Sequence, residues 1–178
     1  MKNVLILSSS PRRGGNSDTL CDEFMQGAIE SGHRVEKVFL RDKTIHPCTG
    51  CGVCSQYKKP CPQKDDAAEI IGKMLAADVI VMATPVYFYA MSAQMKTLID
   101  RCCGPYTEMK NKEFYFIATA AEEDETIMKR VVDNFCGFLD CLENPVIKGT
   151  VFGGGVWHVG EIKDKPVLTE AYEMGKKV

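Results

Sequence analysis

Five short apolar runs alternate along the chain with segments in which apolar residues recur at helical spacing. The runs are NVLIL at 3–7, RVEKVFL at 34–40, DVIVMAT at 78–84, EFYFIAT at 113–119 and GTVFGGGVW at 149–157. Three of them are almost continuously apolar, as expected of strands buried on both faces of a sheet, whereas 34–40 is mixed and is expected at an edge. This alternation predicts an α/β protein with a parallel sheet and helices on both faces.

Helices are predicted between the runs, each from an apolar stripe with a period near 3.6 residues. They begin near Ser17, Asp65, Ser92, Asp124 and Pro166, where the residue type favours a helix start. No repeat, low-complexity tract or linker interrupts the 178 residues, so we expect a single domain over 1–178. The common order of five such strands is the doubly wound 2-1-3-4-5, in which ligands bind beyond the carboxyl ends of the strands.

Composition limits the partners and the compartment. The chain has 22 Lys and Arg against 24 Asp and Glu, a net charge of −2, so no broad basic field exists for nucleic acid or an acidic membrane. No apolar stretch approaches membrane-spanning length, and the apolar run 4–7 is too short for a signal peptide. We therefore expect a cytoplasmic protein whose nine cysteines do not form stable disulfides.

The loop after the first run, SSSPRRGGNSDTL at 8–20, has the composition of a phosphate site. It joins a predicted strand to a helix N-terminus, where free amides and the helix dipole favour an anion, and it adds hydroxyls and two arginines. Neither GxxxxGK[ST] nor GxGxxG is present, which disfavours a nucleotide triphosphatase and a Rossmann dinucleotide site. On composition alone, a polar loop with a capped helix is an equal alternative.

A second loop, TPVYFYA at 84–90, follows the third run directly. In the predicted topology it lies across the strand-order reversal from the first loop. Its three neighbouring aromatic residues suit a flat aromatic ligand, with backbone groups available to its edge. The alternative is that these side chains belong to the core at the end of a strand.

The cysteine segment, CTGCGVCSQYKKPCP at 48–62, has the spacing C-x2-C-x2-C-x6-C. This spacing is similar to the ferredoxin run but has a longer final gap, which suits four thiolates on a single cubane cluster. Zinc is a weaker alternative, because structural zinc sites usually use two separated C-x2-C pairs. A transient disulfide and free thiols also remain as alternatives.

In this order, SSSPRRGGNSDTL, CTGCGVC, KDD and TPVYFYAMSAQMKTLIDR resemble the NADPH-dependent FMN reductase and iron–sulfur flavoprotein family. The resemblance covers most of the chain and implies a flavodoxin-like fold that binds FMN. It implies that the phosphate is held by Ser10, Arg12, Asn16 and Ser17, and that the isoalloxazine is lined by Thr84, Pro85, Val86, Tyr87, Phe88, Thr119 and Ala120. The chain departs from the family pattern at Ser9, where glycine is usual, and in the acidic loop after Thr119, which lacks glycine.

The same resemblance implies a [4Fe-4S] cluster on the four cysteines of the segment, which we expect near the flavin end of the sheet. Its ligands would be Cys48, Cys51, Cys54 and Cys61. Trp157 and His158 follow the last apolar run and are candidates for the edge of the flavin pocket or for a subunit contact. The family also suggests a homodimer or homotetramer, with the apolar surface around Met91 and Met95 and the cysteine segment as candidate contacts.

The leading hypothesis is an FMN-dependent NAD(P)H oxidoreductase that reduces flavin, quinone or similar small acceptors by ping-pong hydride or electron transfer. No catalytic acid or base is assigned, because the flavin supplies the redox chemistry. The alternative is an iron–sulfur flavoprotein that carries electrons from a ferredoxin-like protein. A metal-binding module without flavin is a third class, but it leaves the phosphate loop and the aromatic loop unexplained.

Overall fold

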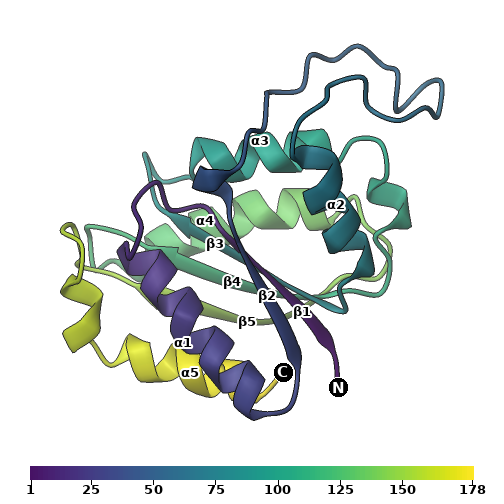
Figure 1. Ribbon diagram of the computed structural model, residues 1–178. Helices are drawn as coiled ribbons and strands as arrows, with labels where there is room; N and C mark the ends of the chain where they lie inside the picture. The colour runs from purple at the N-terminus through teal and green to yellow at the C-terminus, as the bar shows by residue number, and fades with distance from the viewer.

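A computed structural model describes residues 1–178 and confirms the predicted doubly wound α/β fold (Figure 1). Five parallel strands form one sheet in the order β2-β1-β3-β4-β5. The strands are β1 (Asn3–Ser8), β2 (Arg34–Phe39), β3 (Val79–Pro85), β4 (Glu113–Thr119) and β5 (Val146–Gly153). Strand β2 lies at an edge, as its mixed sequence predicts, and most of its residues are partly or fully exposed.

Five helices cover the two faces of the sheet (Figure 1). They are α1 (Asn16–Glu30), α2 (Ala67–Ala76), α3 (Ala93–Arg101), α4 (Glu125–Leu139) and α5 (Val167–Lys176). Helices α1 and α5 lie on one face, whereas α2, α3 and α4 lie on the other. Each begins within two residues of its predicted start. None of them is long and apolar enough to span a membrane.

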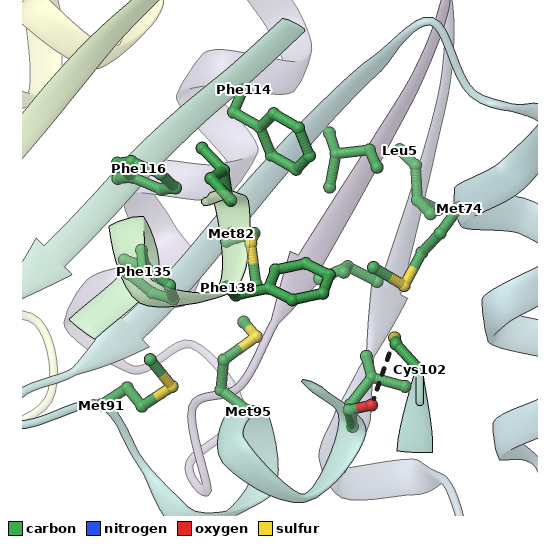
Figure 2. Close-up of a cluster of buried hydrophobic side chains, with 14 of the residues drawn as sticks. Leu5, Met74, Met82, Met91, Met95, Cys102, Phe114, Phe116, Phe135 and Phe138 are labelled. Carbon is green, nitrogen blue, oxygen red and sulfur yellow. Dashed lines mark hydrogen bonds between the residues drawn. The ribbon is translucent and has the colours of Figure 1, made fainter. Parts of the chain in front are cut away.

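The strands separate two hydrophobic cores, because successive side chains of a strand point to opposite faces of the sheet. On the face of α2, α3 and α4, one core contains Met82 and Phe114 of the sheet, Met74 of α2 and Phe138 of α4 (Figure 2). In the same core the rings of Phe116 and Phe135 stack with their centroids 4.7 Å apart. The smaller core on the other face packs β1, β3 and β4 against α1 and α5.

The expectation that Met91 and Met95 form a subunit contact is wrong. Their exposed fractions are only 8% and 0%, and both belong to the larger core. Figure 2 shows that both side chains point into this core rather than toward solvent. These residues stabilise the domain instead of presenting an interface.

The last strand differs from its predicted span of 149–157. Strand β5 begins at Val146, and a register shift opposite Phe114 and Tyr115 inserts an extra residue into its pairing with β4. It ends at Gly153, because the chain then turns at Gly155, whose φ of +66° favours glycine. Residues 156 and 157 therefore lie in a loop at the carboxyl ends of the strands rather than in the sheet.

Helices α1 and α5 approach each other backbone to backbone. A Cβ atom at Gly27 would overlap the carbonyl oxygen of Tyr172, and a Cβ atom at Gly175 would overlap the carbonyl oxygen of Phe24. Only glycine permits this distance between the helix axes. The helix that follows the phosphate loop is thus fixed by the last helix of the described chain.

Candidate functional site

A hollow of about 130 Å³ lies at the carboxyl ends of β1, β3 and β4, where doubly wound sheets bind their ligands. Its walls come from four loops, which follow β1, β3, β4 and β5. Nine of the eleven residues assigned to FMN by resemblance line it, namely Ser10, Arg12, Asn16, Ser17, Pro85, Val86, Tyr87, Thr119 and Ala120. Segments more than 100 residues apart in the sequence thus meet at one place.

The other two assigned residues, Thr84 and Phe88, do not line the hollow. Thr84 is fully buried, and its Oγ1 accepts a hydrogen bond from the amide of Ser92 at 2.8 Å. Its hydroxyl also donates to the carbonyl oxygen of Pro85 at 2.9 Å. The two hydrogen bonds hold the backbone of the second loop from its buried side. Phe88 is fully exposed at the tip of that loop.

Serine hydroxyls join the first loop to the second. Ser9 Oγ donates to the carbonyl oxygen of Ala83 at 2.7 Å, and Ser92 Oγ donates to Ser9 Oγ at 2.9 Å. Both serines are fully buried. The departure from glycine at position 9 is therefore used structurally, because the added hydroxyl ties the loop after β1 to the end of β3.

The N-terminus of α1 presents unpaired hydrogen-bond donors at the hollow. Ser17 Oγ is buried without a hydrogen-bond partner, and no acceptor within the chain bonds the amides of Asn16 and Ser17. A Cβ atom at Gly15 would lie 2.5 Å from Ser10 Oγ, so glycine is required for the backbone to come this close. Unpaired donors at the positive end of a 15-residue helix favour a dianion. These residues fit the phosphate of FMN.

The carboxylate of Asp18, in the first turn of α1, is paired with Lys37 of β2. Asp18 accepts hydrogen bonds from Ser8 Oγ at 2.9 Å and from the amide of Gly14 at 3.1 Å, and it pairs with Lys37 at 3.0 Å. Burial alone would lower the pKa of Lys37, but hydrogen bonds to Asp22 and Asp18 outweigh burial and raise it. The lysine therefore stays charged and balances the carboxylate.

The aromatic loop is a tight two-residue turn. The amide of Val86 donates to the carbonyl oxygen of Thr119 at 2.8 Å, and Tyr87 and Ala90 pair across the turn. Phe88 and Tyr89 have φ angles of +50° and +62°, which Asn and Gly normally occupy in such turns. Of the aromatic side chains of this loop, Tyr87 lines the hollow, whereas the guanidinium of Arg130 lies over the ring of Tyr89, 5.0 Å from its centroid.

The fourth wall of the hollow comes from Val156 and Trp157, after β5. The sequence reasoning assigned neither residue to the cofactor, although it noted Trp157 as a candidate edge. The amide of Val156 donates to the carbonyl oxygen of Ala120 at 2.9 Å, and this bond brings the loop beside the end of β4. The available signal was a tryptophan close to the carboxyl end of the last strand. The predicted strand, 149–157, included this residue, whereas β5 ends at Gly153, so the prediction did not place Trp157 in a loop.

The cysteine segment lies elsewhere, against the C-terminal end of α3. Arg101 Nη2 donates to Cys61 Sγ at 3.4 Å, and a Cβ atom at Gly104 would lie 3.0 Å from the Cβ of Cys54. The hollow is lined instead by residues that precede this nine-residue helix in the chain, among them Pro85, Val86 and Tyr87. No residue of the segment lines the hollow, and its expected place near the flavin end of the sheet stays a prediction.

The four cysteines are not brought together as ligands. Cys48 and Cys51 are exposed, Cys54 and Cys61 are half-buried, and no group of three His, Cys, Asp or Glu residues is placed to hold a metal ion. Burial raises the pKa of the Cys54 thiol, with a further contribution from Cys103, which the sequence reasoning did not connect with the motif. The donor chemistry suits an iron–sulfur cluster, but this arrangement does not fit one.

The three histidines have structural contacts. His33 Nδ1 accepts a hydrogen bond from the amide of Lys2 at 3.1 Å. The amide of His46 donates to Asp65 at 2.9 Å, and the carbonyl oxygen of His158 accepts from the side chain of Asn16 at 2.9 Å. None of the three lines the hollow.

Comparisons with known proteins agree with this geometry. The family model for NADPH-dependent FMN reductase matches residues 2–155. An iron-sulfur flavoprotein from Archaeoglobus fulgidus is 44% identical over 185 residues, covering 100% of this chain and 79% of that protein. An iron-sulfur flavoprotein from Methanocaldococcus jannaschii is 44% identical over 98 residues, so this match spans 55% of the chain and only 50% of the relative.

Solved structures share the fold. An NAD(P)H:quinone oxidoreductase from Methanothermobacter marburgensis superposes with a TM-score of 0.78 at 17% identity, covering 99% of this chain and 96% of that one. An azoreductase from Bacillus anthracis superposes with a TM-score of 0.74 at 16% identity over 100% of both chains. At these identities the structures establish only the flavodoxin-like architecture. The family model, and the relative that matches along the whole of this chain, establish the family: the chain belongs to the NADPH-dependent FMN reductase family.

Proposed function

We propose that this chain binds FMN in the hollow and acts as an NAD(P)H-dependent oxidoreductase that reduces flavin, quinone or similar small acceptors. The observation that carries the proposal is the buried, unpaired Ser17 hydroxyl at the N-terminus of α1, in a chain that matches the FMN reductase family over residues 2–155. A volume of about 130 Å³ suits the phosphate and polyol chain, so the flat ring would lie at the open rim beside Tyr87.

Bound FMN would supply the hydride and electron chemistry, and the chain would bind and orient it. The amides of Val86, Tyr87 and Ala120 are already bonded within the chain. The amide of Ala121 has no acceptor in the chain, and this residue lines the hollow. We therefore assign Ala121 N–H as the backbone donor to the edge of the ring, where it would stabilise developing negative charge.

The side chains at the hollow support turnover without protein acid–base catalysis. None of its fourteen lining residues is a His, Asp, Glu, Lys or Cys. Tyr87 and Trp157 line this single rim, so we propose that the nicotinamide donor and the acceptor occupy it in turn, which gives ping-pong kinetics. The cytoplasmic location and the homo-oligomeric state stay predictions.

Titration of the flavin-free chain with FMN and with riboflavin, followed by reduction with NADPH or NADH, tests the proposal. We expect FMN to bind more tightly than riboflavin and its 450-nm absorbance to bleach on addition of one of the two nucleotides. Ser17→Ala should weaken FMN binding by about tenfold or more and leave riboflavin binding unchanged, because only FMN carries the phosphate. Thr19→Ala is the matched control one half-turn along α1. Failure to bind FMN, or equal losses for both ligands, would reject this assignment.

A second candidate function is that of an iron–sulfur flavoprotein electron carrier, with a ferredoxin-like protein as the electron donor. It is favoured by the 44% identity over the whole chain to an iron-sulfur flavoprotein. A cluster on the four cysteines would require the segment to rearrange, and we derive no electron path through it. Iron and acid-labile sulfide measured after anaerobic purification test this candidate. Four of each per chain, abolished by Cys54→Ser, would support it, whereas iron-free protein with rapid NAD(P)H turnover would leave the reductase.

A further inference from the structure

The loop at 156–162, beyond β5, lies outside the residues that the family model matches. Two buried side chains anchor it, because Val156 is 6% exposed and Ile162 is 0% exposed. Between these anchors, Trp157 and Val159 are exposed, and Gly160 turns the chain with a φ of +95°. The loop is therefore a fixed element with an exposed aromatic side chain.

Asn16 forms a three-point contact with this loop. Its Nδ2 donates to the carbonyl oxygen of His158 at 2.9 Å, and its Oδ1 accepts from the amides of Gly160 at 3.2 Å and Ile162 at 3.4 Å. A carboxamide has two acceptor positions and two N–H donors. Both acceptor positions and one donor of the carboxamide are thus occupied within the chain, which leaves the Asn16 side chain a single N–H for any ligand.

Two further side chains hold the backbone of Trp157 from both sides. Glu161 Oε2 accepts from the amide of Trp157 at 2.6 Å and from the amide of His158 at 2.9 Å. Arg12 Nη1 donates to the carbonyl oxygen of Trp157 at 3.0 Å. These two amide donors lower the pKa of the Glu161 carboxyl, so it remains an ionised acceptor at neutral pH.

The loop presents the indole of Trp157 at the rim of the hollow. The residue lines the hollow together with Tyr87, but 66% of its surface is exposed. The indole N–H forms no hydrogen bond within the chain, so packing and hydrogen bonding of the described chain do not explain its placement. A large, flat, rigidly mounted aromatic side chain is suited to stack on a planar ring.

We propose that Trp157 forms the aromatic wall of the flavin site opposite Tyr87, and that Asn16 acts as a positioning residue for this wall rather than as a ligand of the phosphate. This inference rests on the proposed flavin site and replaces one of the roles that the resemblance implies. Ser17 and the free amides of α1 remain to bind the phosphate. Asn16 and Glu161 instead determine how well the planar part of the ligand stacks.

The two roles of Asn16 are separated by comparing FMN with riboflavin, which has the same ring but no phosphate. We expect Asn16→Ala and Trp157→Ala to weaken both ligands by the same factor, about five- to tenfold. The double variant should be little weaker than either single variant, because both changes remove the same wall. Trp157→Phe should retain most of the affinity.

Glu161 gives an independent test. Glu161→Ala should weaken both ligands as Asn16→Ala does, whereas Glu161→Gln should remain close to the parent, because its carbonyl oxygen still accepts from the two amides. Trp157 is the only tryptophan, so its fluorescence anisotropy reports directly on the loop. In the absence of ligand, the anisotropy should fall in Asn16→Ala and Glu161→Ala.

The outcomes separate this inference from the proposed function. If the parent chain binds neither FMN nor riboflavin, the flavin site itself is wrong. If the parent binds both and Asn16→Ala weakens FMN alone, Asn16 is a phosphate ligand and the inference is overturned. Unchanged riboflavin binding in Trp157→Ala would also overturn it.

Discussion

Replacement of Arg101 by methionine should destabilise the chain more than any other single charge removal on α3. The Arg101 side chain is 2% exposed and faces Asp65, which is 0% exposed. The guanidinium donates to Asp65 Oδ2 at 2.6 Å and Oδ1 at 3.1 Å, and to the carbonyl oxygen of His46 at 2.8 Å. Methionine keeps the apolar stem of the arginine but leaves the carboxylate buried without its partner.

The magnitude follows from this burial. Breaking a buried, hydrogen-bonded ion pair on one side costs about 3–5 kcal/mol, whereas a domain of this kind has about 5–15 kcal/mol of stability. Arg101→Met should therefore remove a large part of the free energy of unfolding. Lys96→Met is the matched control, because Lys96 and Asp100 form an exposed pair on the same helix. That change should cost about 0.5 kcal/mol or less.

The pH dependence gives the prediction a second readout. Burial alone would raise the pKa of Asp65, but hydrogen bonds from Arg101 and from the amides of His46 and Ala67 outweigh it and hold the pKa well below its usual 3.8. A depressed pKa contributes stability that is present above pH 3.8 and lost as the pH falls toward the folded value. In Arg101→Met the buried carboxyl takes up a proton more readily. The difference between the two proteins should therefore be largest near pH 7 and shrink below about pH 4.

Urea denaturation at pH 7 and at about pH 3, with the slope of each transition compared between variants, measures these differences. A loss below about 1 kcal/mol for Arg101→Met at pH 7 would refute the assignment of a buried, uncompensated carboxylate. Asp65→Asn added to Arg101→Met should restore part of the stability, because it removes the unpaired charge. Equal losses in the single and double variants would mean that lost packing, not charge, sets the cost.

Three further changes test other features of the fold and site. Gly27→Ala should lower the free energy of unfolding in urea by about 1–3 kcal/mol, because its Cβ meets the backbone of α5. Gly137→Ala on α4, where a Cβ meets nothing within 4 Å, should raise it by about 0.5–1 kcal/mol. A reversed ranking of the two variants would contradict the α1–α5 packing. Phe88→Gly should raise the free energy of unfolding by about 1 kcal/mol by relieving the positive φ, and an unchanged value would mean that the turn is not strained. Gly15→Ala should weaken FMN binding about tenfold or more by displacing Ser10, and calorimetry that shows parent-like affinity would exclude the close approach.

The sheet order could be predicted from sequence because hydrophobic periodicity is a local signal that repeats in every element. Continuous apolar runs at 3–7, 78–84 and 113–119 correctly predict the three central strands, and the mixed run at 34–40 correctly predicts the edge strand. The loop at 8–20 was also recognisable as a candidate anion site, because serines and glycines between a strand and a helix have a direct physical meaning. Nine of the eleven assigned residues accordingly line one hollow.

What sequence did not reveal was how polar side chains select partners far along the chain. Asn16 bonds a loop more than 140 residues away, and Arg101 bonds Asp65, which lies 36 residues earlier in the chain. No periodicity encodes such pairs. The position of Cys54 beside Gly104 likewise depends on the path of the long connection between β2 and α2. The spacing of the cysteines in the sequence does not determine this path.

The glycine contact between α1 and α5 has a consequence for the order in which the chain becomes functional during synthesis. Chains emerge from the ribosome N-terminus first, at roughly 5–20 residues per second. Helix α1 bears the anion site, but it gains its backbone partner only when Gly175 has emerged, after the loop of Trp157. Nascent chains shorter than this have the phosphate loop without the helix that supports it. Cofactor capture is therefore expected as a late event, which follows the emergence of Gly175 from the ribosome.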